Sequence, residues 1–173
     1  MTSFDSRRRV STYTSAWMPT GDETTYIPSG YFAGGYDAGA EVSGIDKITV
    51  PAETKSTLSA TLSSARWGLS GMANWGVGGY FAGGFPTSGL TSIIDKITIP
   101  ADTVSTLSAT LTQPRRGFGG MANSAVAGYY AGGNTHPWWE YLSGIDKITF
   151  PADTKSTLSA TLTTARIRGD GYG

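Results

Sequence analysis

The 173-residue chain carries 13 basic and 13 acidic side chains, so no net charge draws it to nucleic acid or to an acidic membrane surface. It has no cysteine, which excludes disulfides, thiolate metal sites and cysteine nucleophiles. No apolar core of roughly 7–15 residues follows the N-terminal arginines and no apolar run reaches about 18 residues, so neither a signal peptide nor membrane insertion is predicted. The 24 glycines, together with many serines and threonines and no amphipathic helical pattern, predict an all-β protein.

Residues 1–29 are predicted to be an N-terminal arm with a partial repeat. The segment Thr12–Ala16 stands 49 residues before Thr61–Ala65 and aligns with it in register. Beyond Ala16 the match fades, although the spacing is kept.

From Gly30 onward one six-residue sequence organises the chain. Gly-Tyr-Phe-Ala-Gly-Gly begins at Gly30 and again at Gly79, and Gly-Tyr-Tyr-Ala-Gly-Gly begins at Gly128, an interval of 49 residues both times. Each copy is followed by Ile-Asp-Lys-Ile-Thr, a Pro-Ala, a Ser-Thr-Leu-Ser-Ala-Thr-Leu and an arginine. Self-similarity at this period predicts stacked β-sheet modules, propeller blades foremost. The units are residues 30–78, 79–127 and 128–173, and the last includes part of a fourth repeat.

Each unit is predicted to contain four strands, the number in a propeller blade. In the first unit we expect strands at Tyr31–Ala33, Ile45–Val50, Lys55–Leu62 and Leu69–Ala73, with a loop over Tyr36–Gly44. Paired glycines end the first strand of each unit and are expected to let neighbouring blades pack closely. They are Gly34 and Gly35, Gly83 and Gly84, and Gly132 and Gly133.

A repeated acidic residue is predicted to be structural. Asp46, Asp95 and Asp146 each precede a lysine. Neighbouring residues on a strand point to opposite faces of the sheet, so one Asp-Lys pair cannot act together on a substrate. We expect these aspartates to meet an arginine of an adjacent unit. The candidate arginines are Arg66, Arg116 and Arg166.

No catalytic constellation is predicted. His136 is the only histidine, so a catalytic triad lacks its glycine-flanked nucleophile and a zinc site lacks converging ligands. No Gly-Lys-Ser/Thr phosphate loop occurs. We therefore expect no enzymatic activity, no cofactor and no metal.

The third unit has the most individual loop. It concentrates three aromatic side chains, together with hydrogen-bonding ones, where the other units carry Tyr36-Asp37-Ala38-Gly39 and Phe85-Pro86-Thr87-Ser88. Such side chains serve both sugar rings and protein partners. The candidate binding residues are His136, Trp138, Trp139 and Tyr141. Two interpretations stay open, namely packing against the sheet edge or another subunit, and recognition of a ligand.

Three units are too few to close a propeller ring, because closed propellers typically have about four to eight blades. A three-blade arc would expose two broad apolar faces, which usually mark an interface. The favoured solution is a homodimer that closes a six-bladed ring, with the terminal fragments exchanged across the joint. A trimer of non-propeller β-modules is the alternative.

The order of these features resembles the kelch repeat. The resemblance covers residues 30–173 and rests on Arg66, Arg115 or Arg116, Arg166 and the paired glycines, although leucines occupy the outer strand where kelch repeats carry tyrosine and tryptophan. It implies a kelch-like β-propeller.

The repeat sequence, GYFAGG followed by IDKITFPADTKSTLSATLTTAR, also resembles repeats in tail-fibre and other virion proteins of tailed bacteriophages, especially phages that infect cyanobacteria. That resemblance implies a non-enzymatic structural protein of a virion, in a tail appendage or on the capsid surface. Its partners would be other copies of itself, other virion proteins and, in host recognition, a surface glycan, with no nucleic acid. A free-standing lectin-like or kelch-like binding module is the alternative.

Overall fold

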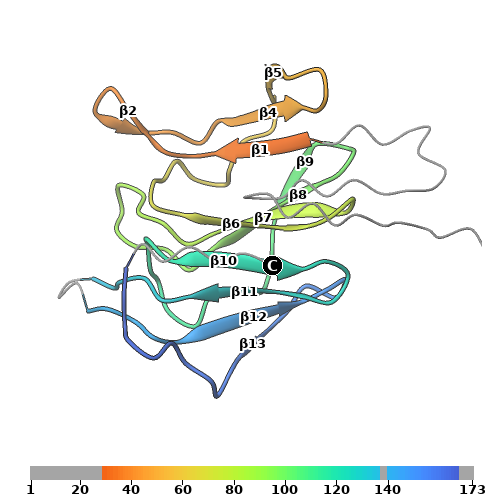
Figure 1. Ribbon diagram of the computed structural model, residues 1–173. Helices are drawn as coiled ribbons and strands as arrows, with labels where there is room; N and C mark the ends of the chain where they lie inside the picture. The colour runs from red at the N-terminus through yellow and green to blue at the C-terminus, as the bar shows by residue number, and fades with distance from the viewer. Residues whose placement is uncertain (1–28, 137–139, 168–173) are drawn as a thin grey trace, which may run out of the picture.

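The computed structural model describes residues 29–136 and 140–167, and within them the chain is all-β. The described residues form thirteen strands in four antiparallel sheets and no helix. Three of these sheets are stacked in chain order (Figure 1), and the stack is open at both ends.

The first sheet contains three strands, in the order β1-β4-β5. They are β1 (Ser29–Ala33), β4 (Ile45–Thr49) and β5 (Thr54–Thr57). The segment predicted as a loop holds a small hairpin of its own, made by β2 (Tyr36–Asp37) and β3 (Ala40–Glu41).

The middle and third sheets each contain four strands, in the orders β6-β7-β8-β9 and β10-β11-β12-β13. The middle sheet contains β6 (Ser70–Asn74), β7 (Gly78–Ala82), β8 (Ile94–Thr98) and β9 (Thr103–Thr106). The third sheet contains β10 (Gly119–Asn123), β11 (Ala127–Ala131), β12 (Ile145–Thr149) and β13 (Thr154–Thr157). Each begins with the last strand of the preceding sequence unit, so the sheets straddle the unit boundaries.

The strand predicted over Lys55–Leu62 is shorter than expected. In the structure β5 ends at Thr57, and the chain bends at Ser59. Leu62 then turns into the core, where it is 3% exposed and its amide donates to the Ser43 carbonyl at 2.9 Å. Burial of this leucine therefore takes the backbone away from the β4 ladder.

Each sheet has two different faces. We call the face toward the preceding sheet the leading face and the face toward the following sheet the trailing face. On β8, Asp95 and Ile97 lie on the leading face, while Ile94 and Lys96 lie on the trailing face. This alternation is the period of two expected of a strand, and it gives every buried sheet two contact surfaces.

Apolar side chains fill both spaces between the sheets. Ile45, Leu62, Phe81 and Ile97 form the cluster between the first and middle sheets. Met72, Tyr80, Ile94, Ile148 and Phe150 belong to the cluster between the middle and third sheets. Full burial of one such side chain contributes about 1.5–3 kcal/mol, so these two layers supply most of the cohesion between the sheets.

The middle and third sheets approach each other most closely along β6 and β10, which lie side by side (Figure 1). A Cβ atom on Gly120 would lie 2.5 Å from the Gly71 carbonyl oxygen, so only glycine permits this spacing. The turns beyond these strands also join, because the Ala125 amide donates to Asn74 Oδ1 at 2.8 Å. Glycine thus allows two strand backbones to pack together at this edge.

Candidate functional site

The most prominent polar feature is an ion pair buried between the first and middle sheets. Arg66 Nη2 lies 2.9 Å from Asp95 Oδ2, and both side chains are fully buried. Arg66 also donates to the Phe81 carbonyl at 3.3 Å, and the Ser63 amide and hydroxyl each donate to Asp95 at 2.9 Å. The predicted meeting of Asp95 with an arginine of the adjacent unit is therefore present.

The same ion pair recurs between the middle and third sheets, with a different arginine from the one expected. Arg115 Nη2 lies 2.7 Å from Asp146 Oδ2, and the Thr112 amide donates to Asp146 at 2.9 Å. The prediction that Arg116 fills this role is wrong. Arg115 is the residue 49 positions after Arg66, whereas the Arg116 guanidinium lies over the ring of Trp67, 4.2 Å from its centroid.

The remaining members of the series, Asp46 and Arg166, lie at opposite ends of the stack. Asp46 contacts Lys55 at 3.2 Å and the Thr57 hydroxyl at 2.6 Å, both within its own sheet. Arg166 is exposed, and its carbonyl oxygen accepts a hydrogen bond from the Gly133 amide at 2.8 Å. The structure does not bring these two residues together.

The two buried aspartates are held in the charged form. Burial alone would raise the pKa of Asp95, but hydrogen bonds from Thr106 and Ser63 and the charge of Arg66 outweigh it and lower that pKa. The pKa of Asp146 is lowered in the same way, against burial, by Thr112, Arg115 and Lys155. Their proton affinity is the reverse of what a general acid at neutral pH requires, which suits a structural ion pair.

A second contact between sheets also repeats. Tyr31 and Lys47 both donate to Asp102 at 2.7 Å, across the space between the first and middle sheets. Tyr80 and Lys96 donate in the same way to Asp153 of the third sheet, at 2.7 Å each. Burial, followed by the hydrogen bond to Asp153, raises the pKa of Tyr80 well above its usual range. The phenol is therefore a fixed donor.

The paired glycines permit close backbone contacts, and a Cβ on Gly84 would lie 2.9 Å from the Trp67 carbonyl oxygen, in the segment that connects the first and middle sheets. Gly34 and Gly83 have positive φ angles of 67° and 59°, and a Cβ on either would lie within 2.6 Å of the Arg66 or Arg115 carbonyl oxygen respectively. The next glycine of each pair donates its amide to that same carbonyl, as Gly35 does to Arg66 at 2.9 Å. Gly132 and Gly133 repeat the arrangement with Arg166. The glycines thus hold the backbone of the arginine that pairs with the following sheet.

Of the predicted binding loop, the structure describes His136 and Tyr141, while Trp138 and Trp139 lie outside the described residues. His136 is exposed, and its ring meets the edge of Phe85 with centroids 6.4 Å apart. Tyr141 is 56% exposed and is bridged to Asn134 through the backbone. The partial repeat of residues 1–28 and residues 168–173 also lie outside the described residues.

His136 belongs to a row of rings that sequence reasoning missed. Trp67 lies between Tyr36 and Phe85, with ring centroids 6.4 Å and 5.8 Å away, and Arg116 lies over both Trp67 and Phe85. The row runs from the β2–β3 hairpin, through the segment before β6, to the segments that follow β7 and β11. A signal was present in the sequence, because Tyr36 and Phe85 occupy the same repeat position, as do Trp67 and Arg116.

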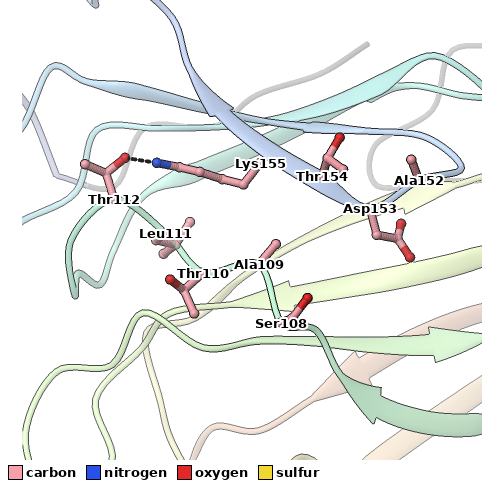
Figure 2. A pocket seen from close by; sticks show the side chains of 9 residues that line it. All are labelled: Ser108, Ala109, Thr110, Leu111, Thr112, Ala152, Asp153, Thr154 and Lys155. Atoms are coloured by element: carbon pink, nitrogen blue, oxygen red, sulfur yellow. Dashed lines mark hydrogen bonds between the residues drawn. The ribbon is translucent and has the colours of Figure 1, made fainter.

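An open groove runs along the outer edge between the middle and third sheets (Figure 2). It is lined by residues 108–112 and 152–155. The Lys155 ammonium group donates to the Thr112 hydroxyl across it, and Asp153 is already held by Tyr80 and Lys96. The groove is therefore the outer opening of a sheet-to-sheet contact, lined by hydroxyl, methyl and paired charged groups.

Among the described residues no group of three or more histidine or acidic side chains could hold a metal ion. The described chain also has no helix of a length and apolarity that would span a membrane. No protein-family model matches the sequence, and no curated protein is detectably similar to it.

Proposed function

We propose that this chain is a non-enzymatic structural component of a bacteriophage virion, in a tail fibre or other appendage or on the capsid surface. In this proposal its sheets are kelch-like propeller blades, and it works through protein–protein contacts. The resemblance of its repeat sequence to repeats in tail-fibre and other virion proteins of tailed phages supports the virion assignment.

The observation that supports a structural role is the location of several charged side chains, which lie between the sheets. The ion pairs Arg66–Asp95 and Arg115–Asp146 are buried between sheets, and the Lys47–Asp102 and Lys96–Asp153 pairs also link one sheet to the next. These are the groups from which an enzyme would draw acids and bases, yet here they fix one module against another. Such an array suits a part that must keep its shape within an assembly.

The virion assignment is tested on particles of the phage whose genome encodes the chain. Particles are purified by density gradient, and the chain is quantified by mass spectrometry against the major capsid protein. We expect a fixed ratio that survives a high-salt wash, and antibody labelling at one location on the particle. Recovery of the chain only in the soluble fraction of the lysate would contradict the proposal.

A second candidate is a lectin-like or kelch-like binding module, which the aromatic row favours. Tyr36 is 61% exposed, and the row continues through Trp67 and Phe85 to the exposed His136. Aromatic side chains supply a large apolar area, and Tyr and Trp add a hydrogen-bonding group, which suits a binding surface. The same surface could serve host recognition by a virion protein.

The second candidate is tested by replacing exposed aromatic residues on this surface. Tyr36→Ala and His136→Ala should abolish binding on a glycan array and leave the mass in native solution unchanged. The double variant Trp138→Ala/Trp139→Ala separates the two interpretations of the loop. Lost glycan binding with unchanged assembly favours recognition, whereas lost assembly favours packing.

A further inference from the structure

The leading face of the first sheet exposes an apolar position that is buried in the other two sheets. Phe81 is 7% exposed and Tyr130 is fully buried, because each lies against the sheet before it. Phe32 occupies the same position on β1 and is 68% exposed. An exposed phenylalanine costs hydration free energy that a covering sheet would recover.

The trailing face of the third sheet exposes the complementary positions. Met72 is 8% exposed where the third sheet covers it, whereas Met121, at the same position on β10, is 39% exposed. Ile45 and Ile94 are fully buried on their trailing faces, and their equivalent Ile145 is only half-buried. Each end of the stack therefore exposes one apolar surface of a contact. The complete contact is present between the first and middle sheets and again between the middle and third sheets.

At the two ends of the stack, the polar groups that form the two repeated contacts have no partner on another sheet among the described residues. On the third sheet, the donors Tyr129, Lys147 and Arg166 correspond to Tyr80, Lys96 and Arg115, but no described acceptor faces them. On the first sheet, the acceptors Asp46 and Glu53 correspond to Asp95 and Asp102, and no described donor from another sheet reaches them. All the leftover donors are at one end, and both leftover acceptors are at the other.

The acceptors are already shaped for the contact. Glu53 has a φ angle of 51°, matching the 54° of Asp102 and Asp153, so its turn presents the carboxylate as the other two turns do. Asp46 pairs with Thr57 in the same ladder register as Asp95 with Thr106. A preformed surface loses less conformational entropy on binding than one that must be ordered.

We propose that the trailing face of the third sheet binds the leading face of the first sheet of a second copy of this chain. Arg166 pairs with Asp46 of that copy, Tyr129 and Lys147 bind its Glu53, and its Phe32 is covered. Two copies joined at both ends make a closed pair of six sheets, within the range of about four to eight that closed propellers use. The inference deepens the proposed function and rests on its protein–protein contacts, but not on the virion assignment.

Charge reversal tests the first pair. Arg166→Asp or Asp46→Arg places like charges at the joint and should weaken association on the order of 100-fold or more. The double variant Asp46→Arg/Arg166→Asp restores an opposite pair at each joint and should recover most of it. Asp37→Arg is the matched control, because Asp37 is exposed and lies on the separate β2–β3 hairpin rather than on a strand of the first or third sheet. Association is measured by native mass spectrometry and sedimentation across a dilution series.

Cross-linking tests the direction of the contact. The chain has no cysteine, so Lys147→Cys and Glu53→Cys can be installed singly or together. A short bismaleimide should link two chains in the double variant, and in a mixture of the two single variants, but not in either single variant alone. A single variant that cross-links with itself would indicate a two-fold contact of identical faces and overturn the head-to-tail arrangement.

The native mass gives the remaining outcomes. A mass of two chains supports the closed pair, whereas a stable monomer or an open-ended series of masses overturns it. Neither contrary result touches the virion assignment, which the particle fractionation decides separately. Failure of the chain to co-purify with particles would in turn leave a two-chain mass and the charge-swap recovery intact.

Discussion

At the residue scale, the repeated ion pairs show what the sequence could and could not predict. The recurrence of aspartate and arginine predicted a structural pair, because neighbouring strand residues face opposite ways. The sequence offered Arg115 and Arg116 as adjacent candidates, and strict repeat spacing would have selected Arg115. It could not predict that the partner of each arginine is the aspartate of the following sheet. Every unit carries both residues, and the repeat spacing does not show which of the two neighbouring sheets each one contacts.

Removing one partner of the buried pair should be costly. Arg66→Met leaves the Asp95 carboxylate buried without its counter-charge, and we expect a loss of about 3–5 kcal/mol in the free energy of unfolding. Chemical denaturation measures this loss. Arg66→Met/Asp95→Leu removes both charges and should be more stable than Arg66→Met alone. Equal stability of the single and double variants would mean that the carboxylate is not desolvated as the structure indicates.

The lowered pKa values of Asp95 and Asp146 predict loss of stability in acid. A carboxyl whose folded pKa lies below its unfolded value, which is about 3.9, adds stability that is complete well above that value. The contribution disappears as the pH falls through the folded pKa, so unfolding should become easier below about pH 4. Thermal unfolding between pH 6 and pH 2 (an experimental range of about four pH units) measures this effect. In Asp95→Asn/Asp146→Asn the starting stability should be lower and the dependence on pH shallower.

At the element scale, strand positions were more predictable than sheet membership. The Ile-Asp-Lys-Ile-Thr segments form β4, β8 and β12 as expected, because alternation and β-branched residues predict strands locally. The short β5, the β2–β3 hairpin and the pairing of β6 and β10 with strands of the following sequence unit depend on packing between distant residues. Local patterns carry no information about such contacts.

The close approach of β6 and β10 predicts a position-specific effect of glycine replacement. Gly120→Ala places a Cβ 2.5 Å from the Gly71 carbonyl oxygen, so the two sheets must separate, and we expect a loss of about 1–3 kcal/mol in unfolding free energy. Gly44→Ala is the matched control, because nothing lies within 4 Å of the added atom and its φ is not positive. Denaturation curves of the two variants should differ clearly. Similar curves would contradict the close backbone contact.

At the scale of the whole molecule, the chain is a series of similar modules whose ends differ from its middle. In such arrays stability is approximately a sum of module terms and contacts between neighbours. The middle sheet is covered on both faces, while the first and third sheets each have one uncovered face among the described residues. The sequence predicted this imbalance from the number of repeats, since three modules cannot close a ring. The sequence alone does not show which side chains at the two ends lack a partner on another sheet, because that depends on the neighbouring sheet that each side chain contacts.

This imbalance predicts how hydrogen exchange should differ among three identical strands. β4, β8 and β12 share the sequence Ile-Asp-Lys-Ile-Thr and each lies between two partner strands, so their intrinsic exchange rates are closely matched. In Arg166→Asp, which we expect to be monomeric, β8 should exchange at least roughly tenfold more slowly than β4 and β12, because the end sheets open without disturbing the middle one. In the unaltered chain, well above its dissociation constant, the three strands should become nearly equal, since each sheet is then covered on both faces. Exchange followed by mass spectrometry or NMR distinguishes the two patterns, and an equal rate for all three strands in Arg166→Asp would contradict the uneven distribution of contacts.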